Sequence, residues 1–147
     1  MMATGTTRTL PTRDVAQASW RGMRGRCPQC GKGKLFASFL KVNEFCPECG
    51  EALHHHRADD APPYVVITIV GHIIVGGALY LEKAYAPEMW IQMALWVPLT
   101  VILSVALLQP VKGALIGVQW ALRMHGFDPN SPEAQEPPPS ALKAAAR

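Results

Sequence analysis

Two long apolar runs occupy the middle of this 147-residue chain and restrict what it can fold into. They cover residues 64–81 and 90–108, and neither contains Asp, Glu, Lys or Arg. As helices they would be about 27 and 28 Å long, close to the roughly 30 Å hydrocarbon core of a bilayer. A chain of this length has little other polypeptide to cover two such helices. The sequence therefore predicts a transmembrane hairpin over residues 59–110.

Positive charge is distributed unevenly around these runs. Residues 1–62 carry nine Lys and Arg, the segment after Leu108 carries four, and the break at 82–89 carries one. By the positive-inside rule, both termini are expected in the cytoplasm and the 82–89 loop on the opposite side. The first 26 residues show no signal-peptide pattern, which agrees with this orientation. The net charge of +3 is too small to indicate nucleic-acid binding by itself.

The four cysteines form the most specific motif in the sequence. Cys27 and Cys30 lie in one C-P-x-C-G pentapeptide, Cys46 and Cys49 lie in a second copy, and fifteen residues separate Cys30 from Cys46. Two thiolates on a tight turn can bind one edge of a tetrahedral Zn²⁺ ion at about 2.3 Å, and the second turn supplies the opposite edge. A reducing compartment disfavours disulfides. We therefore predict a structural Zn²⁺ site in a zinc-ribbon module over residues 14–58.

The residues around the cysteines agree with such a module. Gly31 and Gly50 follow the second cysteine of each pair and can adopt a left-handed backbone that directs N–H groups at the sulfurs. Residues 34–42 have the β-branched and aromatic character of short ribbon strands. So few apolar residues cannot stabilise a unit of this size alone, and metal binding has to supply much of its folding free energy.

Other chemistry remains open for the same cysteines. C-P-x-C also resembles the dithiol of glutaredoxins, although no βαβ context accompanies it here. Thiolates bind Cu(I) as well, so copper transfer is a further alternative. His54, His55 and His56 follow closely and can bind a second ion, but a solvated linker run is the preferred explanation.

The basic residues near the cysteines suggest a charged partner. Zinc ribbons with such charges often bind nucleic acid, but few aromatic side chains are free to stack on bases here. Residues 14–23 can form a short helix that approaches the next module or lies on the membrane surface. In the second case Trp20 would lie at headgroup level, with Arg21, Arg24 and Arg26 near anionic lipid. Membrane lipid is therefore an expected partner, and nucleic acid is disfavoured.

Within the first apolar run, His72 is the only strongly titratable side chain. At bilayer depth such a residue suggests contact with a partner or ligand, whereas a hydrogen bond to a neighbouring helix would satisfy a neutral histidine. Gly71, Gly76 and Gly77 leave room for another helix to pack closely, and the second apolar run is one candidate.

Gln109-Pro110 is predicted to end the second span. Residues 111–126 then repeat apolar side chains at spacings of three and four, with charges elsewhere, which predicts an interfacial amphipathic helix on the cytoplasmic face. The Thr-rich lead at 1–13 and the Pro-rich tail at 127–147 lack an apolar period and are predicted to be disordered.

Several motifs together resemble a single family. They are Cys27-Pro-Gln-Cys-Gly-Lys-Gly-Lys-Leu-Phe36, Phe39-Leu-Lys-Val42, Cys46-Pro-Glu-Cys-Gly50, Asp59-Asp-Ala-Pro-Pro-Tyr64 and Val70-Gly-His-Ile73. In this combination the chain resembles, from about Gly22 to Phe127, the bacterial membrane-protein family catalogued as domain of unknown function 983. Ala61 departs from the pattern, because the family more often has Gly at that place.

The resemblance implies an inner-membrane protein with a cytoplasmic zinc ribbon and two spans. Members are sometimes encoded near genes for haem-copper respiratory oxidases and their assembly factors, which implies an accessory or assembly role in such a complex. We therefore expect an all-α membrane protein that acts as a non-enzymatic adaptor. A thiol oxidoreductase or copper-transfer protein that uses the same cysteines is the alternative.

Overall fold

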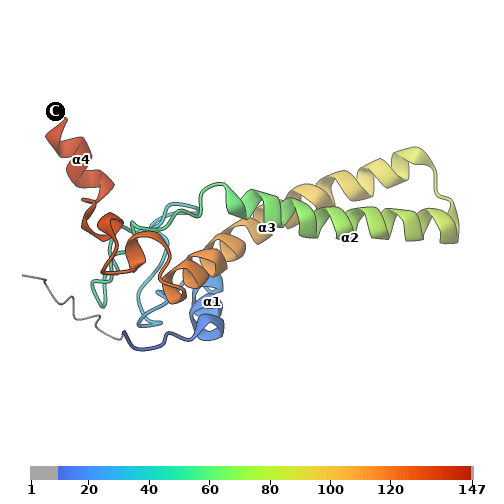
Figure 1. Cartoon of the computed structure of the whole chain (residues 1–147). Coiled ribbons are helices and arrows are strands. Elements are labelled where there is room, and N and C mark those ends of the chain that lie inside the picture. The colour runs from blue at the N-terminus through green and yellow to red at the C-terminus, as the bar shows by residue number, and fades with distance from the viewer. Residues whose placement is uncertain (1–9, 147) are drawn as a thin grey trace, which may run out of the picture.

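Two long antiparallel helices project from a smaller module formed by residues 10–60, and the C-terminal segment 122–146 lies beside that module (Figure 1). The computed structural model describes residues 10–146, so the predicted lead at 1–13 lies largely outside it. The long helices are α2 (Ala61–Tyr85) and α3 (Met89–Ala121). The short helix α1 (Val15–Met23) lies near the C-terminal end of α3, which we call the base of the hairpin. The chain is thus mostly helical, as the sequence predicted.

The two long helices expose most of their apolar side chains. Both are long and apolar enough to cross a membrane, by length and composition. α2 begins with Pro62 and Pro63 in its first turn, where a missing N–H breaks no helical hydrogen bond. Ile67 on α2 is 68% exposed and Ile102 on α3 is 63% exposed. The described part of the chain therefore leaves a large apolar surface uncovered on this hairpin.

α3 continues past the point where the sequence predicted the second span to end. It passes through Pro110 and ends at Ala121, so residues 111–121 do not form the predicted separate interfacial helix. A proline inside a helix costs about 3 kcal/mol. The burial of Ile116 and Trp120 against the module offsets this cost. The apolar face beyond Pro110 therefore packs inside the protein.

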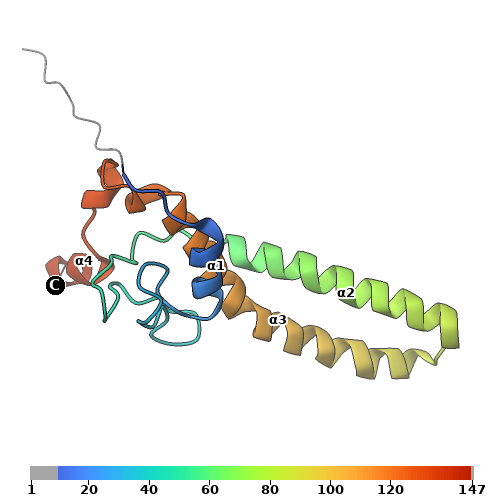
Figure 2. The same cartoon turned by 90° about the horizontal axis from the view of Figure 1, so that it is seen from below.

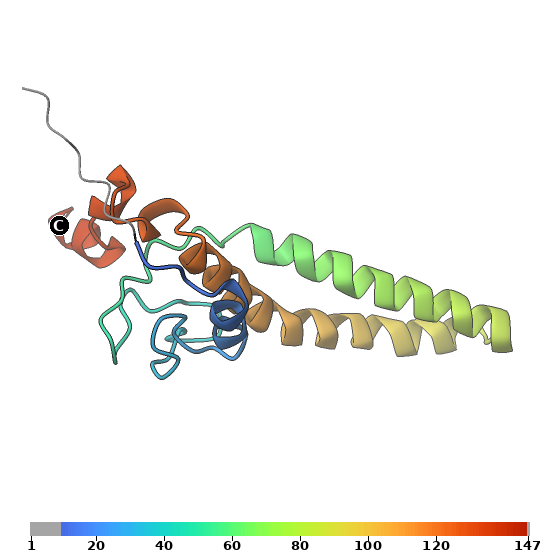
Figure 3. The same ribbon diagram turned by 60° about the horizontal axis from the view of Figure 1, so that its bottom comes forward.

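The short helix α1 crosses the C-terminal part of α3 (Figures 2 and 3). Gly22 and Gly113 bring their backbones into contact, because a Cβ added at Gly22 would lie 2.0 Å from the Gly113 carbonyl oxygen. One turn along α3, a Cβ at Gly117 would lie 2.4 Å from the carbonyl oxygen of Ala18. This crossing thus depends on residues without side chains.

The cysteine-containing segment is held by bridges and a small core. Its three isolated antiparallel bridges join residues 26 and 34, 36 and 42, and 45 and 52. Isolated bridges thus occur where the sequence predicted short strands, because tight turns leave no room for longer pairing. The core also includes a residue of α3, and its members are Cys27, Leu35, Phe36, Val42, Cys46, Leu53, Ala58 and Ile116.

The C-terminal segment contains short helical turns where the sequence predicted a disordered tail at 127–147. Its proline residues prevent a long helix but permit turns that polar contacts hold against the module. Arg57 lies 3.8 Å from a carboxylate oxygen of Glu133 and 3.8 Å from one of Glu136. The turns are η1 (His125–Phe127), η2 (Pro132–Gln135) and α4 (Pro139–Ala145).

Candidate metal centre

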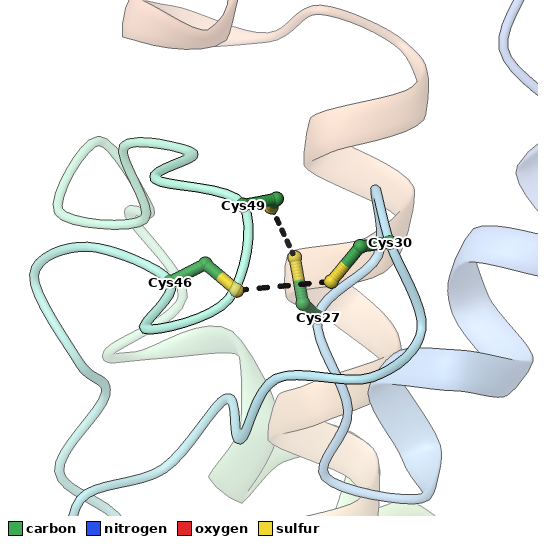
Figure 4. A group of neighbouring side chains, drawn as sticks. All are labelled: Cys27, Cys30, Cys46 and Cys49. Atoms are coloured by element: carbon green, nitrogen blue, oxygen red, sulfur yellow. Dashed lines mark hydrogen bonds between the residues drawn. The ribbon is translucent and has the colours of Figure 1, made fainter.

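The four predicted cysteines converge on one point beside the base of α3 (Figure 4). All four sulfur atoms lie within 4.8 Å of one another. The Sγ atoms of Cys27 and Cys49 are 3.8 Å apart, as are those of Cys30 and Cys46. Ligands bound at about 2.3 Å in a tetrahedron are separated by about 3.8 Å, so these distances fit a shared metal ion. They are much too long for a disulfide bond, which is about 2.05 Å.

The two cysteine turns have the same backbone structure. The amide of Gly31 donates to the carbonyl of Cys27 at 2.9 Å, and the amide of Gly50 donates to the carbonyl of Cys46 at 2.9 Å. Gly31 and Gly50 have φ angles of 69° and 74°, in the left-handed region that glycine adopts without strain. The expectation of left-handed glycines after each pair is therefore confirmed.

Backbone N–H groups favour the thiolate form of Cys30. Gly33 and Lys32 direct their amides at its sulfur, at 3.5 and 3.4 Å. These hydrogen bonds, chiefly that of Gly33, lower the pKa of the Cys30 thiol to about 6. Burial raises the pKa of the Cys27 thiol, because a charge is costly at that fully buried position. A bound cation would remove this cost by neutralising the thiolate.

Gly33 lies against the sulfur cluster. Besides its amide contact with Cys30, its carbonyl accepts a 2.8 Å hydrogen bond from the amide of Cys27. A Cβ at this position would lie 2.3 Å from the Cys46 sulfur. The absence of a side chain at Gly33 is therefore a requirement of the cluster geometry.

Replacing Gly33 by Ala is expected to weaken metal binding by about 10- to 100-fold, the effect typical of residues that orient metal ligands. The added methyl group must displace the Cys46 sulfur. Competition with a chromophoric chelator measures the affinity. The control is Lys32→Ala, which removes an exposed side chain and keeps the amide that faces Cys30. Equal metal affinity in the two variants would show that Cys46 does not bind as the structure indicates.

The donor set fits a metal ion that prefers sulfur. Four thiolates at tetrahedral separation suit a borderline or soft ion, and hard cations such as Mg²⁺ and Ca²⁺ prefer oxygen ligands. Within residues 10–146, these cysteines are the one group of three or more metal-ligating side chains close enough to share an ion. Cys27, Cys30, Cys46 and Cys49 are thus the residues that would hold it.

The histidines within the described residues do not form a second group that could bind a metal ion. His54, His55 and His56 instead face the C-terminal segment. The rings of His54 and His55 are 3.9 Å apart, and His55 lies edge-on to Phe127 at 6.1 Å. The Nε2 atom of His54 lies 3.2 Å from the carbonyl oxygen of Glu136. The histidine run therefore forms part of the surface that the C-terminal segment contacts.

The predicted helix-packing glycines of α2 have different surroundings. Gly77 faces α3, where a Cβ would lie 2.5 Å from the ring of Trp96. A Cβ at Gly71 or Gly76 would have no atom within 4 Å, so these two glycines do not face α3, and packing of a partner helix on them stays a prediction. His72 is exposed on the same face, and its Nδ1 lies 2.7 Å from the carbonyl of Thr68 in its own helix.

Sequence reasoning missed the contacts that fasten the module to α3. Gly113 and Gly117 are spaced as in small-xxx-small packing motifs, and this spacing was the available signal. Trp120 on α3 donates from its indole nitrogen to the Glu51 carboxylate at 2.7 Å. Arg13 donates to the backbone carbonyl of Trp120, also at 2.7 Å. No local pattern indicates these two partners, because they are distant in sequence.

Comparison with known proteins identifies the family. A family model matches residues 36–120, more than half of the chain, and is described as protein of unknown function DUF983. The match includes the second cysteine pair and nearly all of both long helices, and the first pair precedes it. No curated protein and no solved structure matches the chain. The chain therefore belongs to the DUF983 family, as its motifs suggested.

Proposed function

We propose that this chain is a non-enzymatic zinc protein of the bacterial inner membrane. In this proposal it acts as an accessory subunit or assembly factor of a larger membrane complex, and a respiratory haem-copper oxidase is the candidate. The observation that carries the proposal is the attachment of a four-thiolate cluster to the base of an uncovered apolar hairpin. The choice of complex rests on the family resemblance.

A structural role for the metal is supported by the number of protein ligands. Four cysteine thiolates complete the tetrahedral coordination of Zn²⁺, and no position remains for a reactive water or a substrate. Catalytic zinc sites instead keep one position open. In the proposed protein, zinc therefore holds the two cysteine turns together and shapes a surface on the module.

The dimensions of α3 support membrane insertion. Its 33 residues extend over about 50 Å, of which about 30 Å would cross the hydrocarbon core. The remainder reaches into the polar module, where Ile116 and Trp120 are buried. Lipid would cover the apolar surface that the described chain leaves exposed. The positive-inside rule then puts the module and both termini in the cytoplasm.

The outer face of α2 offers a surface for a partner helix. Gly71, Gly76 and His72 line a shallow hollow of about 510 Å³ on this face. Glycines allow helix backbones to approach closely, and a histidine at this depth is costly to leave facing lipid. We propose that a transmembrane helix of the complex packs against this surface.

One observation favours the alternative, in which the cysteines perform redox or copper-transfer chemistry. Cys30 is partly exposed, and its lowered pKa is typical of reactive thiols. Metal analysis and thiol titration of the native protein separate the two functions. One tightly held Zn²⁺ without reactive thiols supports the structural role, whereas bound Cu(I) or a reversible dithiol supports the alternative.

Purification from native membranes in a gentle detergent tests the proposed role. We expect oxidase subunits to copurify with the wild-type chain and to be lost from a Gly76→Leu variant, which fills the hollow on α2. The substitution begins in open space, because no atom of the described chain outside the neighbouring α2 backbone lies within 4 Å of a Cβ at Gly76.

The control is Val101→Leu, which enlarges an exposed side chain on α3 and should keep the partner. Both variants should retain one zinc ion per chain. If only unrelated membrane proteins copurify with the wild type, the oxidase is rejected as the partner complex. Retention of the subunits by Gly76→Leu would reject the α2 surface.

A further inference from the structure

A basic hollow lies between α1 and the first cysteine turn, outside the metal centre. It has a volume of about 520 Å³ and is lined by Trp20, Arg21, Arg24, Arg26, Gly31 and Lys32. Both elements are near the base of the hairpin (Figure 3). Four cations therefore surround a space that an anion can enter.

These cations are not neutralised by carboxylates within residues 10–146. Arg21 donates to the carbonyls of Pro28 and Gln29 at 3.2 and 2.8 Å, which are neutral acceptors. The charge of its guanidinium group is therefore not paired with an acidic side chain of the described chain. Arg26 makes a similar contact, because it donates to the carbonyl of Lys32 at 2.9 Å.

Among the four cations, Arg24 and Lys32 make the fewest side-chain hydrogen bonds within the module. The guanidinium group of Arg24 lies over the ring of Trp20, 4.5 Å from its centre. The side chains of Arg24 and Lys32 form no hydrogen bond to another group in the described chain, and both are exposed. Trp20 is 53% exposed. These three side chains are therefore available to a ligand.

The position of the hollow along α3 matches the headgroup layer of a bilayer. α1 meets α3 at Gly113, five residues and thus about 7 Å beyond Leu108, where the apolar run ends. The headgroup region on each side of the hydrocarbon is about 5–8 Å thick. Arg24 also lines a smaller hollow with Gln109 and Pro110, directly after that run. This step rests on the membrane insertion proposed above.

We infer that this hollow binds the phosphate group of an anionic phospholipid. Arginine can donate two parallel hydrogen bonds to phosphate oxygens, and lysine supplies a compact positive charge. Tryptophan prefers the membrane interface, where its ring meets apolar chains and its N–H meets water. Nucleic acid fits less well, since Trp20 is the one aromatic side chain that lines the hollow and offers no row of stacking surfaces.

Native mass spectrometry of the full-length zinc-loaded protein in detergent tests this site. The probes are dioleoyl-phosphatidylglycerol and its neutral phosphatidylcholine counterpart. We expect the wild type to prefer phosphatidylglycerol, and the double variant Arg24→Gln/Lys32→Gln to bind it about thirty-fold more weakly. The matched control is Lys34→Gln/Lys41→Gln, which removes the same charge from exposed positions of the module outside the hollow. It should retain wild-type affinity.

Retention of bound zinc shows that a variant is folded. If Arg24→Gln/Lys32→Gln loses its zinc, the single variant Arg24→Gln is tested in its place. An equal loss in both double variants would show general attraction to the module and overturn the site. So would equal binding of both lipids, displacement by an equal concentration of inorganic phosphate, or tighter binding of a single-stranded RNA oligomer. The measurement does not depend on copurifying subunits, so selective lipid binding without an oxidase would reject only the proposed role.

Discussion

Replacing Cys27 by Ser is expected to release the metal and to unfold residues 26–58, while the hairpin of α2 and α3 remains helical. Cys27 is fully buried within the core of the module. In small modules of this type, binding of structural Zn²⁺ contributes about 10–16 kcal/mol, and this is also folding free energy. Loss of one of four ligands removes most of it.

The secondary structure of the segment explains why the metal is decisive. Three isolated bridges replace regular strands, so few backbone hydrogen bonds hold the segment together. Its core includes two of the cysteines themselves, Cys27 and Cys46. Without the ion, those buried thiols no longer connect the two turns. The long helices keep their own hydrogen bonds, and we therefore expect two independent parts.

Hydrogen exchange resolved by segment measures this result, together with zinc content and far-ultraviolet circular dichroism in detergent. Fast exchange should appear in residues 26–58 and leave α2 protected. Gln29→Ser is the control, since it changes an exposed residue of the same turn and leaves all four ligands in place. A Cys27→Ser protein that keeps its metal and its protection would contradict the proposed coordination.

The cysteine cluster and the long helices could be predicted because their signals are local. Two C-P-x-C-G turns bring thiolates into pairs, and a tetrahedral ion then requires the pairs to meet. The apolar runs indicated two helices from length and composition alone, and the helices exceed those runs at both ends. Turn geometry and the length of an apolar run need no knowledge of tertiary contacts.

The end of α3 and the structure of the tail could not be predicted in this way. Pro110 is a local signal to stop a helix, but the packing of Gly113 and Ile116 against the module outweighs it. Likewise, Pro-rich sequence indicates disorder unless distant groups such as Arg57 and Glu44 bind the turns. Gly71 and Gly76 show the same limit, because glycine spacing does not tell which neighbour a helix face meets.

Replacing Gly113 by Ala is expected to detach α1 from α3 and to destabilise the module by about 1–3 kcal/mol, the usual cost of overpacking. The new Cβ would lie 1.9 Å from the carbonyl oxygen of Gly22. That atom belongs to the backbone, so no side chain can rotate away and α1 itself must move. The adjacent contact between Gly117 and Ala18 would open as well.

The same substitution at Gly76 should have the opposite effect, which makes it the matched control. Nothing lies within 4 Å of a Cβ at Gly76, and Ala stabilises a helix interior by about 0.5–1 kcal/mol relative to Gly. Hydrogen exchange of α1 amides and the thermal midpoint of the detergent-solubilised protein measure both variants. Midpoints that shift in the same direction would contradict the close backbone contact.

The Gly113→Ala variant also separates the metal centre from the basic hollow. All four cysteines lie outside α1, so we expect one zinc ion per chain to remain. Arg21 and Trp20 move with α1, and the hollow should open, so that binding of phosphatidylglycerol weakens while zinc is retained. If zinc and lipid binding were lost together, the crossing of α1 over α3 would have to be part of the metal-binding fold as well.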